Sequence, residues 1–411
     1  FSLPATAQAT GAARAPENGP APENGPAPDE AVARFDRAQA HGYHSVIALV
    51  RALTERGSSA AGGITLVTGG AVDVLGADLT HPEQSGLHGL AAVLAQENPG
   101  LLCRLVDVDA DGAATTSGFT DLATQVLTDA VGEHTGPVAW RGHRRWVRCY
   151  DQHRLPVPQN LADLVGPGRT VLITGGLGNV GFGMARHLAA TQGCRLVLTT
   201  RSALPSGPAA VAAAAAGDRA AGYLRRIAEL EQAGAEVLAL SADVADVEQM
   251  TAVVRAAEAR FGGIDVVVHA AGVQQAGYFG LAHTLDRSVA DAHFAAKVHG
   301  FHVLQQVLPP SGGQPRITLS SLSTVLGGIT FGPYAAANAA MDGYAVAARE
   351  QGLGTWVSVD WDAWRTTAPA DGQATSVTAY EMTLPEGISG REPGPGGAAA
   401  EGHPPAAPPP T

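Results

Sequence analysis

The chain has 411 residues, of which 45% are hydrophobic, so it is long enough for two domains with packed cores. A formal net charge of −12 argues against a nucleic-acid surface, because phosphate binding requires clustered Lys and Arg. Three widely spaced cysteines form no disulfide framework, no signal peptide is visible and no apolar run reaches membrane-helix length, which favours a cytoplasmic location.

Both ends of the chain are expected to be flexible. Residues 1–30 are rich in Ala, Pro and Gly and contain a tandem Ala-Pro-Glu-Asn-Gly-Pro repeat. Such a composition cannot bury enough apolar surface to offset the entropy lost on ordering. The Gly, Pro and Ala content of 389–411 indicates a second flexible segment. Between them we expect two α/β stretches, over 31–156 and 157–388.

The first α/β stretch is predicted to contain a helix over 46–54, a strand over 64–68, a helix over 85–96 and a strand over 103–107. The second stretch repeats the alternation of strand and helix more clearly. Its expected strands are 171–173, 196–198, 237–240, 266–268 and 317–319. Strands separated by helical segments pair in parallel, with helices on both faces of one sheet. The second stretch is therefore predicted to be a doubly wound parallel α/β fold.

A glycine-rich segment, 174–181, lies between the strand at 171–173 and a helix expected from about 180 to 190. Gly176, Gly178 and Gly181 give the GxGxxG spacing, which permits a tight turn and places a helix N-terminus against a pyrophosphate. A simple tight turn is the alternative, but the strand before and the helix after favour a dinucleotide site. The predicted contacts are Thr174, Gly176, Leu177, Gly178, Asn179, Val180 and Gly181.

The end of the next strand predicts NADPH as the coenzyme. An NAD site usually places Asp or Glu there, whereas this chain has Arg201, which can pair with a 2′-phosphate. A solvated surface Arg is the alternative. Two later segments follow strands at the same edge, and for His269 a hydrogen-bonded core role is an equal alternative. The further predicted contacts are Ser202, Asp243, Val244, His269, Ala270, Ala271 and Gly272.

Three polar residues have the chemistry for reducing a carbonyl group. A Tyr hydroxyl can give a proton to the developing alkoxide, and a Ser hydroxyl can hold the carbonyl oxygen. Ser321 ends a predicted strand at the carboxyl edge of the sheet, where open α/β folds bind ligands. Tyr334 and Asn338 are four residues apart and so share one face of a helix. Together they predict a reductive site.

These segments resemble the ketoreductases of polyketide synthases and animal-type fatty acid synthases, in the short-chain dehydrogenase/reductase superfamily. The ordinary Tyr-x-x-x-Lys pattern is absent, because Asn338 stands where Lys would be. Lys297, 24 positions before Ser321, resembles the family's displaced Lys, and Ser321 lies 13 positions before Tyr334. Segments 175–181, 269–273 and 359–364 are also similar to family motifs.

The resemblance assigns roles to four residues. It implies that Tyr334 is the general acid and that Ser321 orients the carbonyl. It implies that Lys297 lowers the pKa of Tyr334, touches the nicotinamide ribose and relays protons through water near Asn338. The four form the expected catalytic set, and no metal is expected.

The resemblance covers roughly residues 30–387 and includes the first half of the chain. It implies that 31–156 is a degenerate Rossmann-like structural subdomain, with 64–70, 87–109 and 139–150 as its segments. The last of these is expected to be the strand that leads to the catalytic part, 157–388. The implied activity is stereoselective, NADPH-dependent reduction of a 3-oxoacyl thioester on an acyl carrier protein to the 3-hydroxyacyl thioester. Neighbouring polyketide synthase domains are the implied partners.

The sequence departs from the family pattern in three places. Some members have Leu-Asp-Asp where this chain has Gln274-Gln275-Ala276, and others have Trp where it has Leu326. Neither signature of stereochemistry is present, which disfavours the Leu-Asp-Asp class slightly. Residues 382–387 begin like a family helix, but the chain then turns to Gly and Pro, so a short lid over the substrate is expected.

Two other functions stay open at this point. A catalytically silent scaffold domain of a synthase would bind NADPH without turning it over. A stand-alone epimerase or reductase of the extended short-chain dehydrogenase group would share the glycine-rich loop, although that group normally keeps Tyr-x-x-x-Lys.

Overall fold

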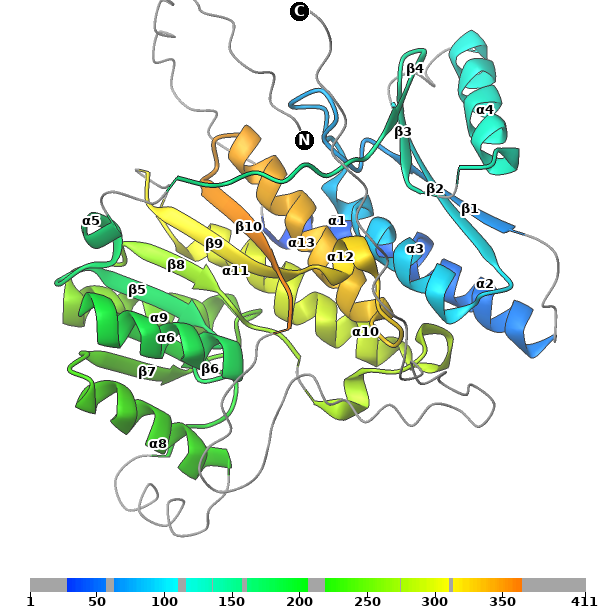
Figure 1. Ribbon diagram of the computed structural model, residues 1–411. Coiled ribbons are helices and arrows are strands. Elements are labelled where there is room, and N and C mark those ends of the chain that lie inside the picture. The colour runs from blue at the N-terminus through cyan, green and yellow to red at the C-terminus, as the bar shows by residue number, and fades with distance from the viewer. Residues whose placement is uncertain are drawn as a thin grey trace, which may run out of the picture.

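The computed structural model describes residues 28–56, 63–109, 116–134, 136–156, 161–205, 219–273, 275–309 and 313–363 (Figure 1). The predictions for the C-terminal tail, the 382–387 segment and Gln274 lie outside these residues. The helix that begins at Pro28 includes the last residues of the expected N-terminal linker. Among the described helices, none has the length and apolar character needed to cross a membrane.

The first half of the chain forms a four-stranded sheet in the order β1-β2-β3-β4. Its strands are β1 (Gly63–Gly69), β2 (Leu102–Val108), β3 (Val138–Arg141) and β4 (Arg144–Val147). The first three are parallel, and β4 returns antiparallel to β3 after a turn in which Gly142 has φ 56°. The single strand expected over 139–150 is therefore wrong: that segment is a hairpin followed by non-strand chain from 148.

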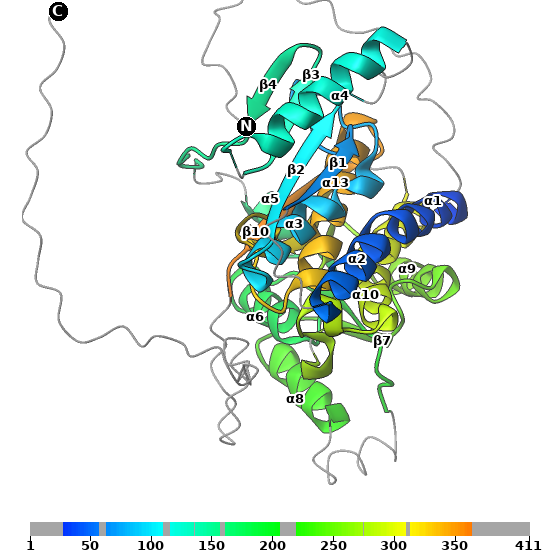
Figure 2. The same ribbon diagram turned by 90° about the vertical axis from the view of Figure 1, so that its right-hand side faces the viewer.

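Helices cover both faces of this small sheet. The helices of this half are α1 (Pro28–His41), α2 (Tyr43–Glu55), α3 (Gly86–Glu97) and α4 (Thr116–Val131), with a short turn at Pro82–Gln84, and of these α3 and α4 contact the sheet. Leu122 and Val126 of α4 pack against Val106 and Val138 of the sheet. Figure 2 shows α4 on the outer side of the small sheet, whereas α3 lies between this sheet and α13.

The second half forms a six-stranded parallel sheet in the order β10-β9-β8-β5-β6-β7. Its strands are β5 (Thr170–Thr174), β6 (Arg195–Thr200), β7 (Val237–Ser241), β8 (Val266–His269), β9 (Pro315–Ser321) and β10 (Thr355–Trp361). The strand order reverses between β5 and β8, which is where doubly wound folds open a ligand crevice. The predicted fold class is confirmed.

Helices lie on both faces of the second sheet (Figure 1). They are α5 (Leu161–Val165), α6 (Asn179–Gln192), α8 (Arg219–Gln232), α9 (Val247–Phe261), α10 (Arg287–Phe294), α11 (Gly300–Val307), α12 (Ser323–Leu326) and α13 (Gly332–Glu350), with a π-helical turn at Ala295–His299 and short turns at Ala276–Tyr278 and Ala282–Thr284. Val171 and Ile173 pack in the core with α6, whereas Leu172 packs in the core with α9 and α11. Burial of both faces explains the unbroken apolar runs of the central strands.

The two halves share one hydrophobic core where α3 meets α13. Leu90 and Leu94 of α3 belong to the same buried cluster as Ala336 and Ala340 of α13. At Gly89, an added Cβ would lie 2.7 Å from the carbonyl carbon of Ala335 and closer still to its oxygen. Only a residue without a side chain permits this approach. The first half therefore directly supports the helix that carries Tyr334 and Asn338.

Candidate active site

The glycine-rich turn joins β5 to α6 at the carboxyl edge of the six-stranded sheet. Gly175 has φ 65°, and a Cβ there would lie 2.9 Å from the Cα of Ala271. A Cβ at Gly176 would lie 2.8 Å from the side chain of Leu198, and one at Gly181 would lie 2.6 Å from the carbonyl oxygen of Gly175. The turn is therefore too tight for side chains at these three positions. It places the first backbone N–H groups of α6 next to the carboxyl end of β5. This cradle fits a pyrophosphate.

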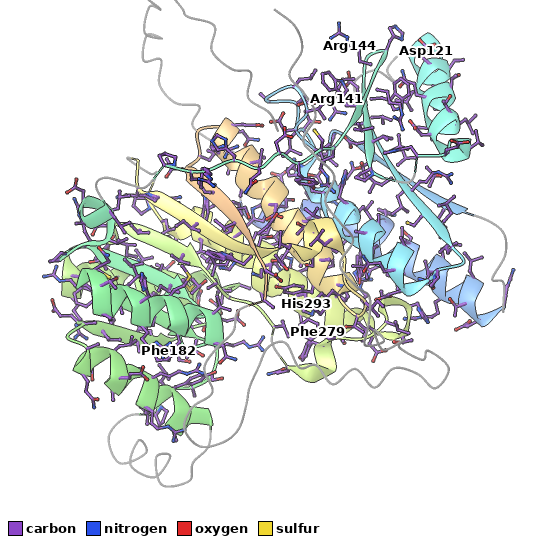
Figure 3. All side chains as sticks on the ribbon, viewed as in Figure 1. Asp121, Arg141, Arg144, Phe182, Phe279 and His293 are labelled. Carbon is purple, nitrogen blue, oxygen red and sulfur yellow. The ribbon has the colours of Figure 1, made fainter. Side chains whose placement is uncertain are left out.

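Arg226 of α8 contacts this turn, a contact that the sequence analysis did not predict. Its guanidinium donates to the carbonyl oxygen of Leu177 and, over 2.8 Å, to Oδ1 of Asn179. It also lies 5.0 Å from the ring centroid of Phe182, which Figure 3 labels on α6. Burial lowers the pKa of Arg226. Through these contacts the Arg226 side chain joins α8 to the start of α6 and holds the glycine-rich turn in place.

The predicted coenzyme residues after β6 and β7 lie at the same sheet edge. Arg201 is exposed directly after β6, and the carbonyl oxygen of Ser202 accepts a hydrogen bond from Ser241 over 3.2 Å. The Asp243 carboxylate accepts the Ala245 N–H over 3.0 Å at the turn that leads into α9. Val244 is buried. This edge can therefore meet the adenosine end of a dinucleotide.

His269 is fully buried at the end of β8, and both ring nitrogens have partners. Nε2 donates to the carbonyl oxygen of Lys297 over 3.1 Å, which leaves Nδ1 to accept from the Thr174 hydroxyl over 2.8 Å. That hydroxyl accepts the Ala271 N–H over 3.3 Å. Burial lowers the pKa of His269 to about 3, so the ring is neutral. His269 therefore has the hydrogen bonds of a core residue, and it holds the 270–272 backbone and Lys297 in place.

Tyr334, Ser321 and Asn338 meet at the junction of β9 and α13. Tyr334 lies in the first turn of α13, and Ser321 is the last residue of β9, where its Oγ accepts the Ser323 N–H over 3.1 Å. Burial raises the pKa of Tyr334, while the neighbouring Ser321 and Asn338 side chains lower it. The net shift is upward, opposite to the lowering expected from Lys297. The phenol is therefore protonated at neutral pH.

Lys297 lies in the π-helical turn between α10 and α11 and is 6% exposed. Its Nζ donates to the carbonyl oxygen of Leu319 over 2.6 Å, two residues before Ser321 on β9. A Cβ added to Gly272 would lie 3.4 Å from its Cε. Burial lowers the pKa of Lys297 to about 8, against the opposing effect of Asp342. The structure thus places the ammonium group beside both the 269–272 loop and the strand that ends at Ser321.

Two further buried polar side chains, Asn338 and Asp342, follow Tyr334 along α13. Asn338 donates its side-chain amide to the Tyr334 carbonyl oxygen over 2.9 Å, and its Oδ1 is buried with no hydrogen-bond partner among the described residues. One turn further along α13, Asp342 accepts from Ser320 over 3.0 Å and from Ser358. Burial and the nearby Asp360 raise the pKa of Asp342 to about 8. Asp342 was not among the predicted site residues, although its spacing places it on the Tyr334 face of α13.

Comparison with known proteins identifies the family. Residues 169–366 match the family model described as the KR domain. Residues 169–366 form a KR domain of the type I polyketide synthase kind. The chain is 33% identical over 326 residues to an erythronolide synthase of Saccharopolyspora erythraea and 34% identical over 322 residues to a pikromycin polyketide synthase component of Streptomyces venezuelae. Each match covers 77% of this chain, but 9% and 19% of the relatives.

Solved structures agree with the assignment of the KR domain. A-type ketoreductases from a modular polyketide synthase align with a TM-score of 0.62 at 28% identity, covering 80% of this chain and 63% of theirs. The first ketoreductase of the tylosin polyketide synthase aligns with a TM-score of 0.62 at 29% identity, covering 81% of this chain and 66% of its own. KR domains are oxidoreductases of Rossmann fold that use a nicotinamide coenzyme. Within the part of the chain that the structure describes, no group of three His, Cys, Asp or Glu residues is arranged to hold a metal.

Proposed function

We propose that this KR domain catalyses the stereoselective, NADPH-dependent reduction of a 3-oxoacyl thioester to the 3-hydroxyacyl thioester. The observation that carries the proposal is the phenol of Tyr334, kept protonated by burial and placed next to Ser321 at the carboxyl edge of the sheet. A neutral phenol beside a hydroxyl group suits proton donation to a developing alkoxide. The relatives that share this domain are polyketide synthases, which supports a thioester on an acyl carrier protein as the substrate.

The reaction needs one hydride and one proton. Bound NADPH would supply the hydride to the carbonyl carbon. The Ser321 hydroxyl would hold the carbonyl oxygen, and Tyr334 would transfer its phenolic proton to that oxygen as the C–H bond forms. Lys297 would then return a proton toward the phenol, with the unpartnered Oδ1 of Asn338 as the acceptor for a relaying water. The carbonyl carbon would thus be reduced at the expense of the nicotinamide of bound NADPH.

The coenzyme contacts form the second part of the proposal. The 174–181 turn and the first amides of α6 would bind the pyrophosphate. Arg201, exposed at the end of β6, would pair with the 2′-phosphate. Ser202, Asp243 and Val244 would line the adenosine, and 270–272 would line the ribose and nicotinamide. We further propose that 31–156 is a structural subdomain and that 157–388 is the catalytic one.

The test follows the transferred hydrogen. The protein is incubated with NADPH carrying deuterium at the transferable C4 position and a 3-oxoacyl thioester, on pantetheine or on an acyl carrier protein. We expect a 3-hydroxyacyl product with one deuterium at C3 and one enantiomer in excess. Binding of NADPH without deuterium transfer would indicate a silent scaffold, and tight retention of NAD without net oxidation would indicate an epimerase. Either result would overturn the proposal.

A further inference from the structure

Gln96, an exposed residue near the end of α3, contacts the loop that precedes α13. Its Nε2 donates to the carbonyl oxygen of Leu326 over 2.6 Å, and its Oε1 accepts the Gly328 N–H over 2.8 Å. Gly327 lies between them with φ 72°, and a Cβ there would lie 2.9 Å from Nε2 of Gln96. One side-chain amide from the first half of the chain therefore hydrogen-bonds a backbone carbonyl before Gly327 and a backbone N–H after it.

Glu97, the last residue of α3, contacts two segments at once. Its Oε1 accepts the Thr330 N–H over 3.0 Å, and its Oε2 accepts the Ala282 N–H over 2.8 Å. Burial raises the pKa of Glu97, and these two backbone N–H groups oppose that rise. The carboxylate thus ties the loop before α13 to the short turn before α10. We refer to Gln96 and Glu97 together as the α3 clamp.

The segments held by the α3 clamp carry the aromatic rings around Tyr334. Phe331 follows Thr330 directly, and its ring centroid lies 5.6 Å from that of Tyr334. Phe279 lies three residues before Ala282, 5.9 Å from Tyr334 and 5.8 Å from Phe331. Figure 3 shows Phe279 beside His293, whose ring lies 6.0 Å from Tyr334. The α3 clamp therefore holds the two segments whose Phe rings pack around Tyr334, the proposed proton donor.

The backbone of the held loop is strained at Thr330. This β-branched residue has φ 74°, in the left-handed region that such residues rarely adopt. Its N–H is held by Glu97, and its carbonyl oxygen accepts from Gly280 over 3.3 Å. Strained backbone persists only where surrounding contacts impose it, and it concentrates at functional sites. Here the contacts that impose it come from the α3 clamp and from the segment that carries Phe279.

We propose that Gln96 and Glu97 are positioning residues for the reduction. By holding the 326–330 and 279–282 segments around Tyr334, they determine which face of the ketone is turned toward the hydride. They would therefore set the ratio of the two alcohol enantiomers, although neither residue touches the reacting atoms. This inference rests on the proposed function and deepens it, because it assigns stereochemical control to side chains from the first half of the chain.

The first experiment tests the hydrogen bonds of the α3 clamp by amide hydrogen exchange, with no substrate present. Gln96→Met keeps the side-chain length but removes both hydrogen bonds, and because Gln96 is exposed the variant is expected to fold. Amide hydrogen exchange over 326–331 should become about fivefold faster, the effect of losing roughly one hydrogen bond. Gln125→Met is the matched control, since its amide donates to the Gly142 carbonyl oxygen over 2.9 Å, far from Tyr334. Unchanged exchange in Gln96→Met would overturn the proposal.

The second experiment measures stereochemistry with a diketide 3-oxoacyl thioester. In Gln96→Met the fraction of the minor enantiomer should rise about fivefold and KM for the thioester should rise, while the affinity for NADPH is unchanged. The control Gln125→Met should keep the wild-type enantiomer ratio, KM and NADPH affinity. Glu97→Ala should change the ratio further. Wild-type turnover with an unchanged ratio in both variants would overturn this proposal alone. A wild-type protein without turnover would instead refute the proposed function, and this inference with it.

Discussion

Replacing Gly89 by Ala would force α3 away from the helix that carries Tyr334. The new Cβ would lie 2.7 Å from the Ala335 carbonyl carbon and 3.1 Å from the Ala339 Cβ. Ordinary carbon contacts are about 3.5–4.0 Å, so the helices must separate by about 1 Å. Overpacking of this kind costs about 1–3 kcal/mol in the free energy of unfolding. A shift of about 1 Å at a proton donor lowers turnover by about 100-fold.

Denaturant unfolding and NADPH-dependent turnover, measured on the same samples, check both expectations for Gly89→Ala. The control is Gly222→Ala in α8, because among the described residues no heavy atom beyond the nearby backbone of α8 itself lies within 4 Å of a Cβ added there. That variant should be about 0.5–1 kcal/mol more stable than the wild type, with the same turnover, because Ala favours a helix interior. If Gly89→Ala kept both the stability and the turnover of the wild type, the α3–α13 contact would not position Tyr334.

Three further variants or conditions test other parts of the account. Arg201→Ala should raise KM for NADPH about 10- to 100-fold and leave KM for NADH unchanged, since a charge-assisted bond to the 2′-phosphate is lost; equal effects on both coenzymes would contradict the assignment. Turnover should fall as pH rises through about 8, because Lys297 loses its proton there while burial keeps Tyr334 protonated; a flat pH profile to 9.5 would exclude Lys297 as the proton carrier. Arg141→Ala should lower the free energy of unfolding by about 3–5 kcal/mol, because the fully buried carboxylate of Asp107 loses its ion pair at 2.8 Å; a loss below about 1 kcal/mol in urea unfolding would show that the pair is dispensable.

Much of the sheet could be predicted from the sequence because its central strands are buried on both faces. Val171, Leu172 and Ile173 form an unbroken apolar run for that reason, and the strand is found where the run predicts it. β10 was not predicted as a strand, because at the sheet edge it alternates apolar residues with Thr, Ser and Asp. The hairpin of β3 and β4 was missed although Gly142 occupies the first turn position, as in one common hairpin turn, because strands of four residues are too short to show a clear alternation.

The site was predictable only where its residues are close in sequence or match a family motif. Tyr334 and Asn338 are one helical turn apart, so their proximity follows from helix geometry. Arg226 contacts the glycine-rich turn across 47 to 49 residues, and Glu97 reaches Thr330 across 233. No local pattern predicts contacts at such separations, because tertiary packing creates them. The π-helical turn that carries Lys297 is likewise set by its surroundings.

The most direct measurement compares NADPH oxidation by the wild type and by Tyr334→Phe with a 3-oxoacyl thioester. The Phe ring keeps the contacts with Phe279 and Phe331, so only the phenolic hydroxyl is lost. We expect turnover to fall by about 10²- to 10⁴-fold, while NADPH binding is unchanged. Turnover by Tyr334→Phe within tenfold of the wild type would contradict the account.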